Sequence, residues 1–216
     1  MDGIIVINKP KGITSREVVN KVCKLLNTKK VGHTGTLDPI ATGVLVLCVG
    51  KATKLVETLT SNDKEYVATV KLGILTDTLD TDGTIIEKKC VNLDKDKLVN
   101  VLNSFIGTYN QEVPIYSAVK VNGKKLYEYA RAKKEVTIPK RMVEIKKIKL
   151  IEFGSDYYKF KVTVSKGTYI RSLIKDINDK LGVIGVMSDL VRTKQGKFSI
   201  NNSYTLENME NNNYNV

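Results

Sequence analysis

The sequence predicts an α+β fold with a largely antiparallel sheet, because strand-like and helix-like segments alternate irregularly along its 216 residues. Residues 66–73 alternate between two faces, which is typical of a half-buried strand. Residues 142–153 and 157–164 flank a Gly-Ser-Asp turn and predict a β-hairpin. Residues 169–181 carry apolar side chains at helical spacing and are followed by Gly182, so they predict a helix that ends there.

The remaining elements follow from capping residues, glycines and apolar runs. Thr14 and Glu17 have capping-box spacing and begin a helix. Asp94 caps a further helix, which Gly107 stops. In chain order the sequence also predicts a buried strand at 3–7, a Gly-rich loop at 29–43, a buried strand at 44–49 and a helix around 52–59.

The composition limits the class of protein. Apolar residues make up 42% and charged residues 27%, which suffices for one large domain or two small ones sharing a sheet. The longest wholly apolar run, Val44–Val49, is far too short to span a bilayer, and no signal-peptide pattern begins the chain. Three widely spaced cysteines predict no disulfide framework, so we expect a cytoplasmic protein without a membrane partner. One histidine and no Cys-x-x-Cys nearly exclude a structural zinc site.

The positive charge is concentrated in one segment. The whole chain has a formal net charge of +12, and residues 118–149 hold 11 Lys or Arg against three Asp or Glu, a net +8. Tyr116, Tyr127 and Tyr129 lie within or beside this segment, and aromatic rings among cations suit a phosphate backbone with bases to stack on. A solvated charged face is the alternative, but we favour contact with nucleic acid.

The loop over residues 31–43 is the strongest candidate for a site. It places three glycines, Asp38 and the only histidine, His33, between a helix and a buried strand. Glycines let a backbone approach a ligand closely, but no Gly-Lys-Ser/Thr ends the loop as in a phosphate-binding P-loop. Nothing marks a serine as the partner of His33 in a catalytic triad. From the residues alone, a structural loop with Asp38 in a turn remains an equal alternative.

Two further stretches contain charged residues at turns. The run Asp77–Gly83 imitates a calcium loop, but Lys89 stands where the closing glutamate is needed, so we interpret it as a structural turn. The run Ser165–Arg171 joins a predicted strand to a helix through a glycine. Taken by itself, Arg171 is interpreted as a surface or capping side chain. If the fold brought it near Asp38, its guanidinium would hold that carboxylate ionised and oriented.

These stretches, together with others, carry a resemblance to a known family. The matching segments are Gly32–Pro39, Ala41–Gly43, Lys64–Tyr66, Asp77–Asp80, Val113-Pro114, Tyr116–Ala118, Gly123–Arg131 and Ser165–Arg171. On these segments the chain closely resembles the TruB-type pseudouridine synthases, the bacterial tRNA uridine-55 pseudouridine synthases. The match runs in order from about Gly3 to about Leu206, and the motifs in combination are highly specific.

The resemblance implies the pseudouridine synthase fold, a mixed and mainly antiparallel sheet flanked by helices with a central RNA-binding cleft. It implies isomerisation of a uridine within RNA: the bond from N1 to the sugar breaks, the base turns, and C5 rejoins the sugar. The family's invariant aspartate falls on Asp38. The family uses neither metal nor organic cofactor, and its target base must leave the stacked loop, so base flipping is implied.

The resemblance also implies roles for five other residues. His33 would help to hold the RNA loop opened by the flip, and Tyr66 would stack on the flipped base. Tyr169 and Leu190 would line the pocket. Arg171 would pair with the catalytic aspartate and keep it ionised.

By the same resemblance, residues 1–206 form the catalytic domain, which includes a basic RNA-gripping insertion at about 114–142. Lys124, Lys125 and Arg131 would contact the RNA backbone. The implied partner is the T-stem-loop of tRNA, and no obligate protein partner is evident.

The end of the chain and one nearby segment depart from the family pattern. Residues 207–216 are rich in asparagine, so we expect a frayed tail and no separate C-terminal RNA-binding domain, although many family members continue into one. Val186 stands where the family often has a histidine, and Val191 where it has the first of two arginines.

Two other functions remain open on the sequence alone. One is a non-catalytic RNA-binding or RNA-folding protein, and the other is the same isomerase acting on a different RNA. Asp38, Tyr66, Tyr169 and Arg171 are all present, which favours the enzyme, since a pure binder needs no carboxylate facing RNA.

Overall fold

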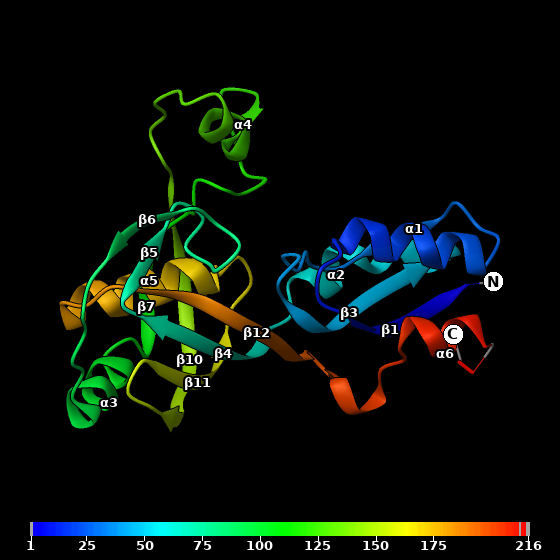
Figure 1. Ribbon diagram of the computed structural model, residues 1–216. Helices are drawn as coiled ribbons and strands as arrows, with labels where there is room; N and C mark the ends of the chain where they lie inside the picture. The colour runs from blue at the N-terminus through cyan, green and yellow to red at the C-terminus, as the bar shows by residue number, and fades with distance from the viewer. Residues whose placement is uncertain (1, 212, 215–216) are drawn as a thin grey trace. The chain divides into compact units, whose positions relative to one another are not determined.

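The computed structural model describes residues 2–211 and 213–214, and the chain divides into two compact units (Figure 1). The first unit comprises Met1–Val67 and Asp189–Val216, and the second comprises Ala68–Ser188. Strands β4 (Lys64–Leu72) and β12 (Gly185–Gln195) have residues in both.

β3 (Thr42–Val49) is the central strand of the first unit, in the order β1-β3-β12. Every residue of β1 (Gly3–Lys9) pairs antiparallel with β3, from Gly3↔Val49 to Lys9↔Gly43. On the other edge, β2 (Val31–His33) pairs with the last residues of β3, and β12 pairs in parallel with the first, at Arg192↔Gly43. β13 (Phe198–Ser199) pairs with β12.

Helices pack on both faces of this small sheet. Helix α1 (Ser15–Leu25) begins at the predicted Thr14–Glu17 capping box and packs Val18 and Val22 into a core with Ile5, Leu45 and Leu47. The opposite face packs Leu59 and Phe198 against Val44 and Val46. The predicted helix at 52–59 is a 3₁₀-helix, Gly50–Leu55, followed by α2 (Val56–Thr60).

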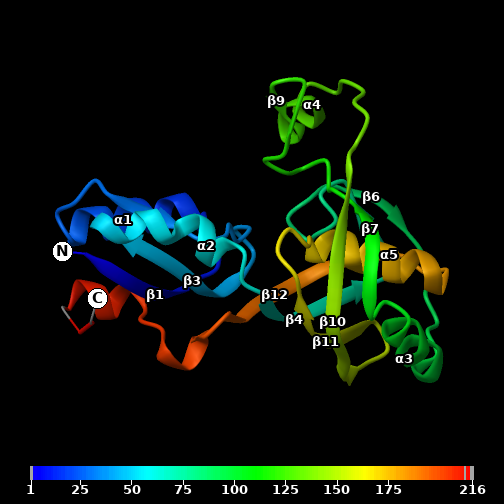
Figure 2. The same cartoon turned by 180° about the vertical axis from the view of Figure 1, so that it is seen from behind.

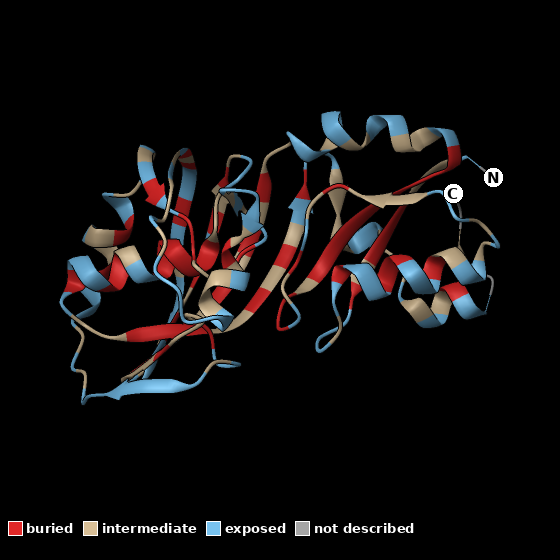
Figure 3. Ribbon diagram, turned by 90° about the horizontal axis from the view of Figure 1, so that it is seen from above, coloured by how far each residue is buried: buried red, intermediate tan, exposed pale blue. Residues whose placement is uncertain are grey.

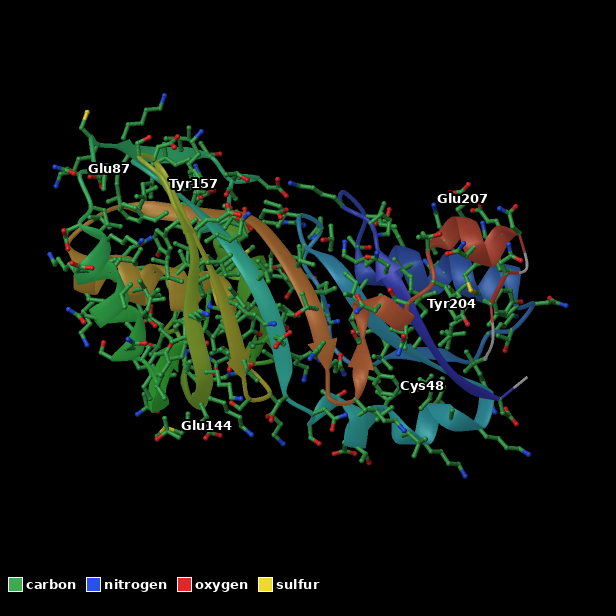
Figure 4. All side chains as sticks on the ribbon, turned by 90° about the horizontal axis from the view of Figure 1, so that it is seen from below. Cys48, Glu87, Glu144, Tyr157, Tyr204 and Glu207 are labelled. Atoms are coloured by element: carbon green, nitrogen blue, oxygen red, sulfur yellow. The ribbon has the colours of Figure 1, made fainter. Side chains whose placement is uncertain are left out.

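The expectation of a frayed tail is wrong for residues 207–210. The backbone of Tyr204 bonds to Val6 and Asn8 of β1; Figure 4 labels Tyr204 and, in the helix that follows it, Glu207. After the 3₁₀ turn Ile200–Asn202, helix α6 (Leu206–Glu210) begins at Thr205, and its Met209 is 1% exposed against α1 and β1. One buried side chain and a capped helix thus order a segment whose composition alone suggested disorder. Residues 212 and 215–216 of the predicted tail lie outside the described residues.

The second unit is built on an antiparallel ladder in the order β12-β4-β11-β10-β7. β10 (Lys140–Phe153) and β11 (Tyr157–Val164) form the predicted hairpin, and β7 (Gly107–Glu112) pairs antiparallel with β10. The hairpin β5 (Ile74–Thr76) and β6 (Ile85–Lys88) is a separate two-stranded sheet. The mixed elements and mainly antiparallel pairing confirm the predicted α+β class.

Helices α3 (Lys95–Asn103) and α5 (Ile170–Leu181) bury their apolar faces in this unit. Asp94 caps α3, and α5 ends at Gly182, as the sequence predicts. Figure 3 shows buried residues concentrated along the strands and exposed residues on the outer sides of the helices. Asn178 of α5 bridges buried groups: it accepts a 2.8 Å hydrogen bond from Tyr158 and donates one of 3.0 Å to the carbonyl of Gly185.

The basic insertion lies between β7 and β10. It contains the short hairpin β8 (Lys120–Val121) and β9 (Lys124–Lys125) and helix α4 (Leu126–Arg131). Figure 2 shows it joined to the rest of the unit through β7 and β10. Leu126, at the start of α4, is fully buried.

A close backbone approach at Gly43 predicts a large loss of stability in Gly43→Ala. Gly43 has φ +96°, and a Cβ there would overlap the carbonyl oxygen of Arg192. Gly12→Ala is the matched control, because Gly12 has φ +86° but faces open space. We expect a cost of about 1–2 kcal/mol at Gly12 from the backbone alone, and about 3 kcal/mol or more at Gly43. Urea unfolding measures both; equal shifts in midpoint would contradict the close approach.

Candidate active site

Asp38 lies in a loop that is anchored on both sides. β2 and β3 form a hairpin with His33 opposite Leu47, and residues 34–41 connect them. Leu37 and Ile40 are 3% and 2% exposed, whereas Asp38 between them is partly exposed. The amide of Ala41 donates to the carbonyl of Asp38 at 3.0 Å and closes a turn. Two buried neighbours therefore present this carboxylate at the surface of the unit.

The start of α1 holds the backbone beside Asp38. The Ser15 hydroxyl accepts from the amide of Leu37 at 2.8 Å and donates to its carbonyl at 3.0 Å. The amide of Gly12 donates to the carbonyl of Pro39 at 2.8 Å. The loop thus has side-chain and backbone partners immediately before and after Asp38.

Lys9 is a buried cation that the sequence analysis did not identify. Its Nζ donates to the carbonyls of Pro10, Ile13 and Pro39 at 2.9, 2.6 and 3.2 Å. Burial lowers the pKa of Lys9 to about 8, and the negative charge of Asp38 opposes that shift. Lys9 therefore acts on Asp38 both through the Pro39 backbone and through its charge.

Arg192 is a second buried cation, 1% exposed, and it holds the other end of the loop. Its Nε donates to the carbonyl of Val44 at 2.6 Å and its Nη2 to that of Gly35 at 3.0 Å. Its Nη1 lies 3.5 Å from the hydroxyl of Tyr66. One guanidinium therefore joins the loop, β3 and β4 within the first unit.

The structure places three further predicted site residues in the first unit. Tyr66 is 7% exposed on β4 and is brought to the Asp38 loop through Arg192. Leu190 is 5% exposed on β12 and shares a strand face with Arg192, two residues on. His33 ends β2, and its Nδ1 is buried without a hydrogen-bond partner. Burial, followed by the charges of Arg16 and Arg192, lowers the pKa of His33.

The other two predicted site residues, Tyr169 and Arg171, lie in the second unit at the start of α5. Tyr169 is the N-cap residue, and its side chain makes no capping bond. Gly167 at φ +80° makes the turn that brings β11 into the helix. The hydroxyl of Thr168 donates to the carbonyl of Ser165 at 3.0 Å and tightens this turn.

Arg171 is 5% exposed and is fixed by the Asp-rich turn and by the insertion. Its Nε lies 3.8 Å from the carboxylate of Asp80. Its Nη1 donates to the carbonyl of Thr78 at 2.9 Å, and its Nη2 donates to that of Tyr116 at 3.1 Å. Asp80 is itself held by the Thr78 hydroxyl at 2.6 Å. The turn interpreted as only structural therefore supplies an anionic partner for Arg171.

The predicted residues thus form two groups. Asp38, His33, Tyr66 and Leu190 belong to the first unit, while Tyr169 and Arg171 belong to the second. The predicted pairing of Arg171 with Asp38 and the central RNA-binding cleft involve both units and remain predictions.

The insertion presents cations around an aromatic ring. Lys125 and Arg131 lie 5.4 and 5.3 Å from the ring centroid of Tyr127, and Lys124 is exposed beside them. The amide of Lys125 donates to Glu128 at 2.9 Å at the start of α4. A hollow of about 650 Å³, lined in part by Ile115, Ala130 and Val136, lies beside this helix.

Two negative observations concern the described residues alone. Among residues 2–211 and 213–214, no three His, Cys, Asp or Glu side chains are grouped as a metal site. Within the same part of the chain, no helix is both long and apolar enough to cross a bilayer.

Comparison with curated proteins finds several close relatives. The tRNA pseudouridine synthase B of Bacillus subtilis is 50% identical over 217 residues, covering 97% of this chain and 70% of the relative. That of Fusobacterium nucleatum is 49% identical over 200 residues, covering 93% of this chain and 70% of the relative.

Solved structures give the same fold. A chain in the crystal structure of a Cbf5-Nop10-Gar1 complex matches with a TM-score of 0.76 and 35% identity over 95% of this chain. A chain in the structure of an H/ACA RNP bound to a substrate RNA containing 2′-deoxyuridine matches with a TM-score of 0.73 and 31% identity over 99% of this chain. The present chain spans about half the length of these solved chains, 53% and 56%.

A family model provides the most direct assignment. The N-terminal domain model of the TruB family pseudouridylate synthases matches residues 23–170, which include the Asp38 loop, Tyr66, the insertion and Tyr169. With half of the residues identical to a curated relative over nearly the whole chain, the resemblance seen in the sequence is confirmed. The chain belongs to the TruB family of pseudouridylate synthases.

Proposed function

We propose that this chain isomerises uridine to pseudouridine in tRNA, with uridine 55 of the T-loop as its target and Asp38 as its catalytic residue. The observation that carries the proposal is the anchored loop, which presents the Asp38 carboxylate between two buried neighbours. Family membership and relatives named tRNA pseudouridine synthase B support it.

The reaction conserves the composition of the nucleoside. The bond from N1 to the sugar breaks and the bond from C5 to the same sugar carbon forms, while C5 loses a proton and N1 gains one. An ionised carboxylate suits each way in which Asp38 can assist, whether by bonding to the nucleoside or by taking a proton. Lys9 lies in the same unit and donates to the carbonyl of Pro39, the residue after Asp38.

The remaining site residues serve binding and orientation in this proposal. Tyr66, its hydroxyl beside Arg192, stacks on the flipped base, and Leu190 lines the pocket. His33, at the end of β2, packs against the opened RNA loop. Tyr169 lines the pocket from the start of α5, and Arg171 pairs with Asp38 while its other contacts fix it in place.

The insertion holds the RNA in this proposal. Lys125 and Arg131 lie over the ring of Tyr127 and Lys124 is exposed next to Lys125 in the chain, so cations for phosphates and a ring for stacking are adjacent. The hollow beside α4 is also lined by Lys133 and Lys134. Because tRNA is the proposed substrate, we place the protein in the cytoplasm, with residues 1–206 as its catalytic domain.

One assay tests the function directly. Purified protein is incubated with unmodified tRNA, and pseudouridine is mapped at every position. Formation of pseudouridine at position 55 by the purified protein alone supports the proposal. It would also show that the reaction needs no second protein. Modification of another RNA alone would identify the same isomerase with a different target. Tight binding without modification would indicate an RNA-binding or RNA-folding protein.

Asp38→Asn should leave folding and tRNA affinity nearly unchanged and remove turnover. The substitution keeps the size of the side chain and deletes the charge that the chemistry uses. Single-turnover formation of pseudouridine and filter binding measure the two effects. Turnover by a preparation free of wild-type protein would rule out the role of Asp38.

Asp80→Asn should lower saturated turnover by roughly 10–100-fold with little change in tRNA affinity. Asp80 is 6% exposed and its carboxylate lies 3.8 Å from Nε of Arg171, so its loss weakens the orientation of that guanidinium. Asp82→Asn is the control, because Asp82 is exposed in the same turn and bonds to Asp80 through its backbone. An equal loss in both variants would mean that the turn acts only through its fold.

Neutralising Lys124, Lys125 and Arg131 together should weaken tRNA binding and flatten its salt dependence. Each lost phosphate contact reduces the log–log salt slope by roughly 0.7–0.9, so three contacts predict a change of about 2–3. Turnover should recover when tRNA saturates the variant, since these side chains hold the RNA and do not act on the base.

Arg171→Ala provides the opposite pattern for comparison. It should lower saturated turnover with less effect on the salt slope, because Arg171 is buried among Asp80 and two carbonyls. A wild-type salt slope in the triple variant would show that the insertion is only a solvated charged face.

A further inference from the structure

Gln111 is a buried amide whose side chain is bonded to the backbone of one distant residue. It is fully buried on β7, the strand that leads into the insertion. Its Oε1 accepts from the amide of Tyr169 at 2.8 Å, and its Nε2 donates to the carbonyl of Tyr169 at 3.1 Å. That carbonyl already accepts from Leu173 in the first turn of α5. The second bond is therefore not needed to satisfy the carbonyl, and its effect is to fix the position of Tyr169.

The orientation of this amide is itself fixed by two further residues. Nε2 of Gln111 also donates to the hydroxyl of Tyr109 at 2.7 Å. The Tyr109 hydroxyl bonds in turn to the carboxylate of Asp176, and burial, before the charge of Asp176, raises the pKa of Tyr109. A neutral hydroxyl donates to Asp176 and accepts from Gln111. A flipped amide would place its NH₂ group against the amide of Tyr169, so only one orientation satisfies every group.

The strand on the other side of the insertion holds the ring of the same tyrosine. Arg141 on β10 is paired directly with Gln111 on β7. Its guanidinium lies 5.5 Å from the ring centroid of Tyr169, a cation–π distance. Its Nη1 also lies close to Gly167, where a Cβ would be 3.4 Å away. Adjacent residues of two strands therefore hold the backbone and the ring of Tyr169.

We propose that Gln111 and Arg141 are positioning residues that tie the Tyr169–Arg171 turn to the two strands that enter and leave the insertion. The contact of Arg171 with the carbonyl of Tyr116, at the start of the insertion, adds a third tie. The inference rests on the proposed function, in which Tyr169 lines the pocket and the insertion grips tRNA. Strands β7 and β10 then position both the insertion that binds tRNA and the Tyr169 side chain that lines the pocket. The flipped base is therefore placed against Tyr169 when the insertion binds the RNA.

Gln111→Leu should lower the single-turnover rate at saturating enzyme by about 10–100-fold, because small displacements of a positioning group cost that much. Its tRNA dissociation constant should stay within about threefold of wild type, because the phosphate contacts are elsewhere. Asn178→Leu is the matched control. Asn178 is also a buried amide of this unit, bonded to Tyr158 and Gly185. The Asn178→Leu variant should lose about as much stability as Gln111→Leu. It should keep the wild-type turnover at temperatures where it is folded.

Two conservative variants separate positioning from folding. Gln111→Glu keeps an acceptor for the amide of Tyr169 and loses the donors, so its rate should fall between those of wild type and Gln111→Leu. Arg141→Met keeps the length of the side chain and removes the charge over the ring, and should lower turnover without the salt-slope change of the insertion variant. If Gln111→Leu does not fold, the Gln111→Glu rate alone decides: a wild-type rate would overturn the proposal.

Hydrogen exchange of the Tyr169 amide tests the geometry without activity. In Gln111→Leu this amide should exchange faster than in wild type, and in Asn178→Leu it should not. Unchanged exchange in Gln111→Leu, or equal losses of turnover in the Gln111→Leu and Asn178→Leu variants, would overturn the positioning role. Absence of turnover in the wild type would instead overturn the proposed function, whatever the exchange shows.

Discussion

The first unit depends on the buried guanidinium of Arg192. Removing a cation from water costs several kcal/mol, so the charge is tolerated only while it is hydrogen-bonded, here to the carbonyls of Val44 and Gly35. Any displacement of the Asp38 loop from β3 would deprive the guanidinium of the Gly35 carbonyl, one of its acceptors. The backbone of Arg192 also explains the glycine at position 43, because its carbonyl oxygen lies too close to Gly43 for a side chain there. The position of the carboxylate is thus set by the need to satisfy a cation on another strand.

The two units use the same kind of hydrogen bond to position the candidate site residues. Lys9, Arg192, Arg171 and Gln111 each donate to main-chain carbonyls of residues distant in sequence. A carbonyl accepts without carrying a formal charge, so these bonds fix loops while leaving the charges of Lys9 and Arg192 unneutralised by them. Burial lowers the pKa of Lys9 to about 8, and the negative charge of Asp38 opposes that shift.

Periodicity and capping predicted the elements well, because α1, α5 and the β10–β11 hairpin carry local signals such as the Thr14–Glu17 box. Resemblance identified Asp38, and the matching family model supports the family though not the role of each residue. Lys9, Gln111 and Arg192 were missed as holding residues, because their partners are backbone carbonyls that leave no pattern in a sequence. Asp80 was assigned to a structural turn because the calcium template failed there and the family match over Asp77–Asp80 gave no role for this residue. In α6, an Asn-rich composition concealed the single buried contact of Met209.

The interleaving of the two units along the chain has a consequence for biosynthesis. The second unit is one continuous segment, Ala68–Ser188, whereas the first is assembled from both ends of the chain. During translation the Asp38 loop is synthesised more than 150 residues before Arg192. The loop therefore lacks the guanidinium that anchors it until most of the chain has been made. The second unit, including the insertion, is complete before that moment. A nascent chain therefore contains the whole second unit, with the basic insertion, before it contains the guanidinium that anchors the Asp38 loop.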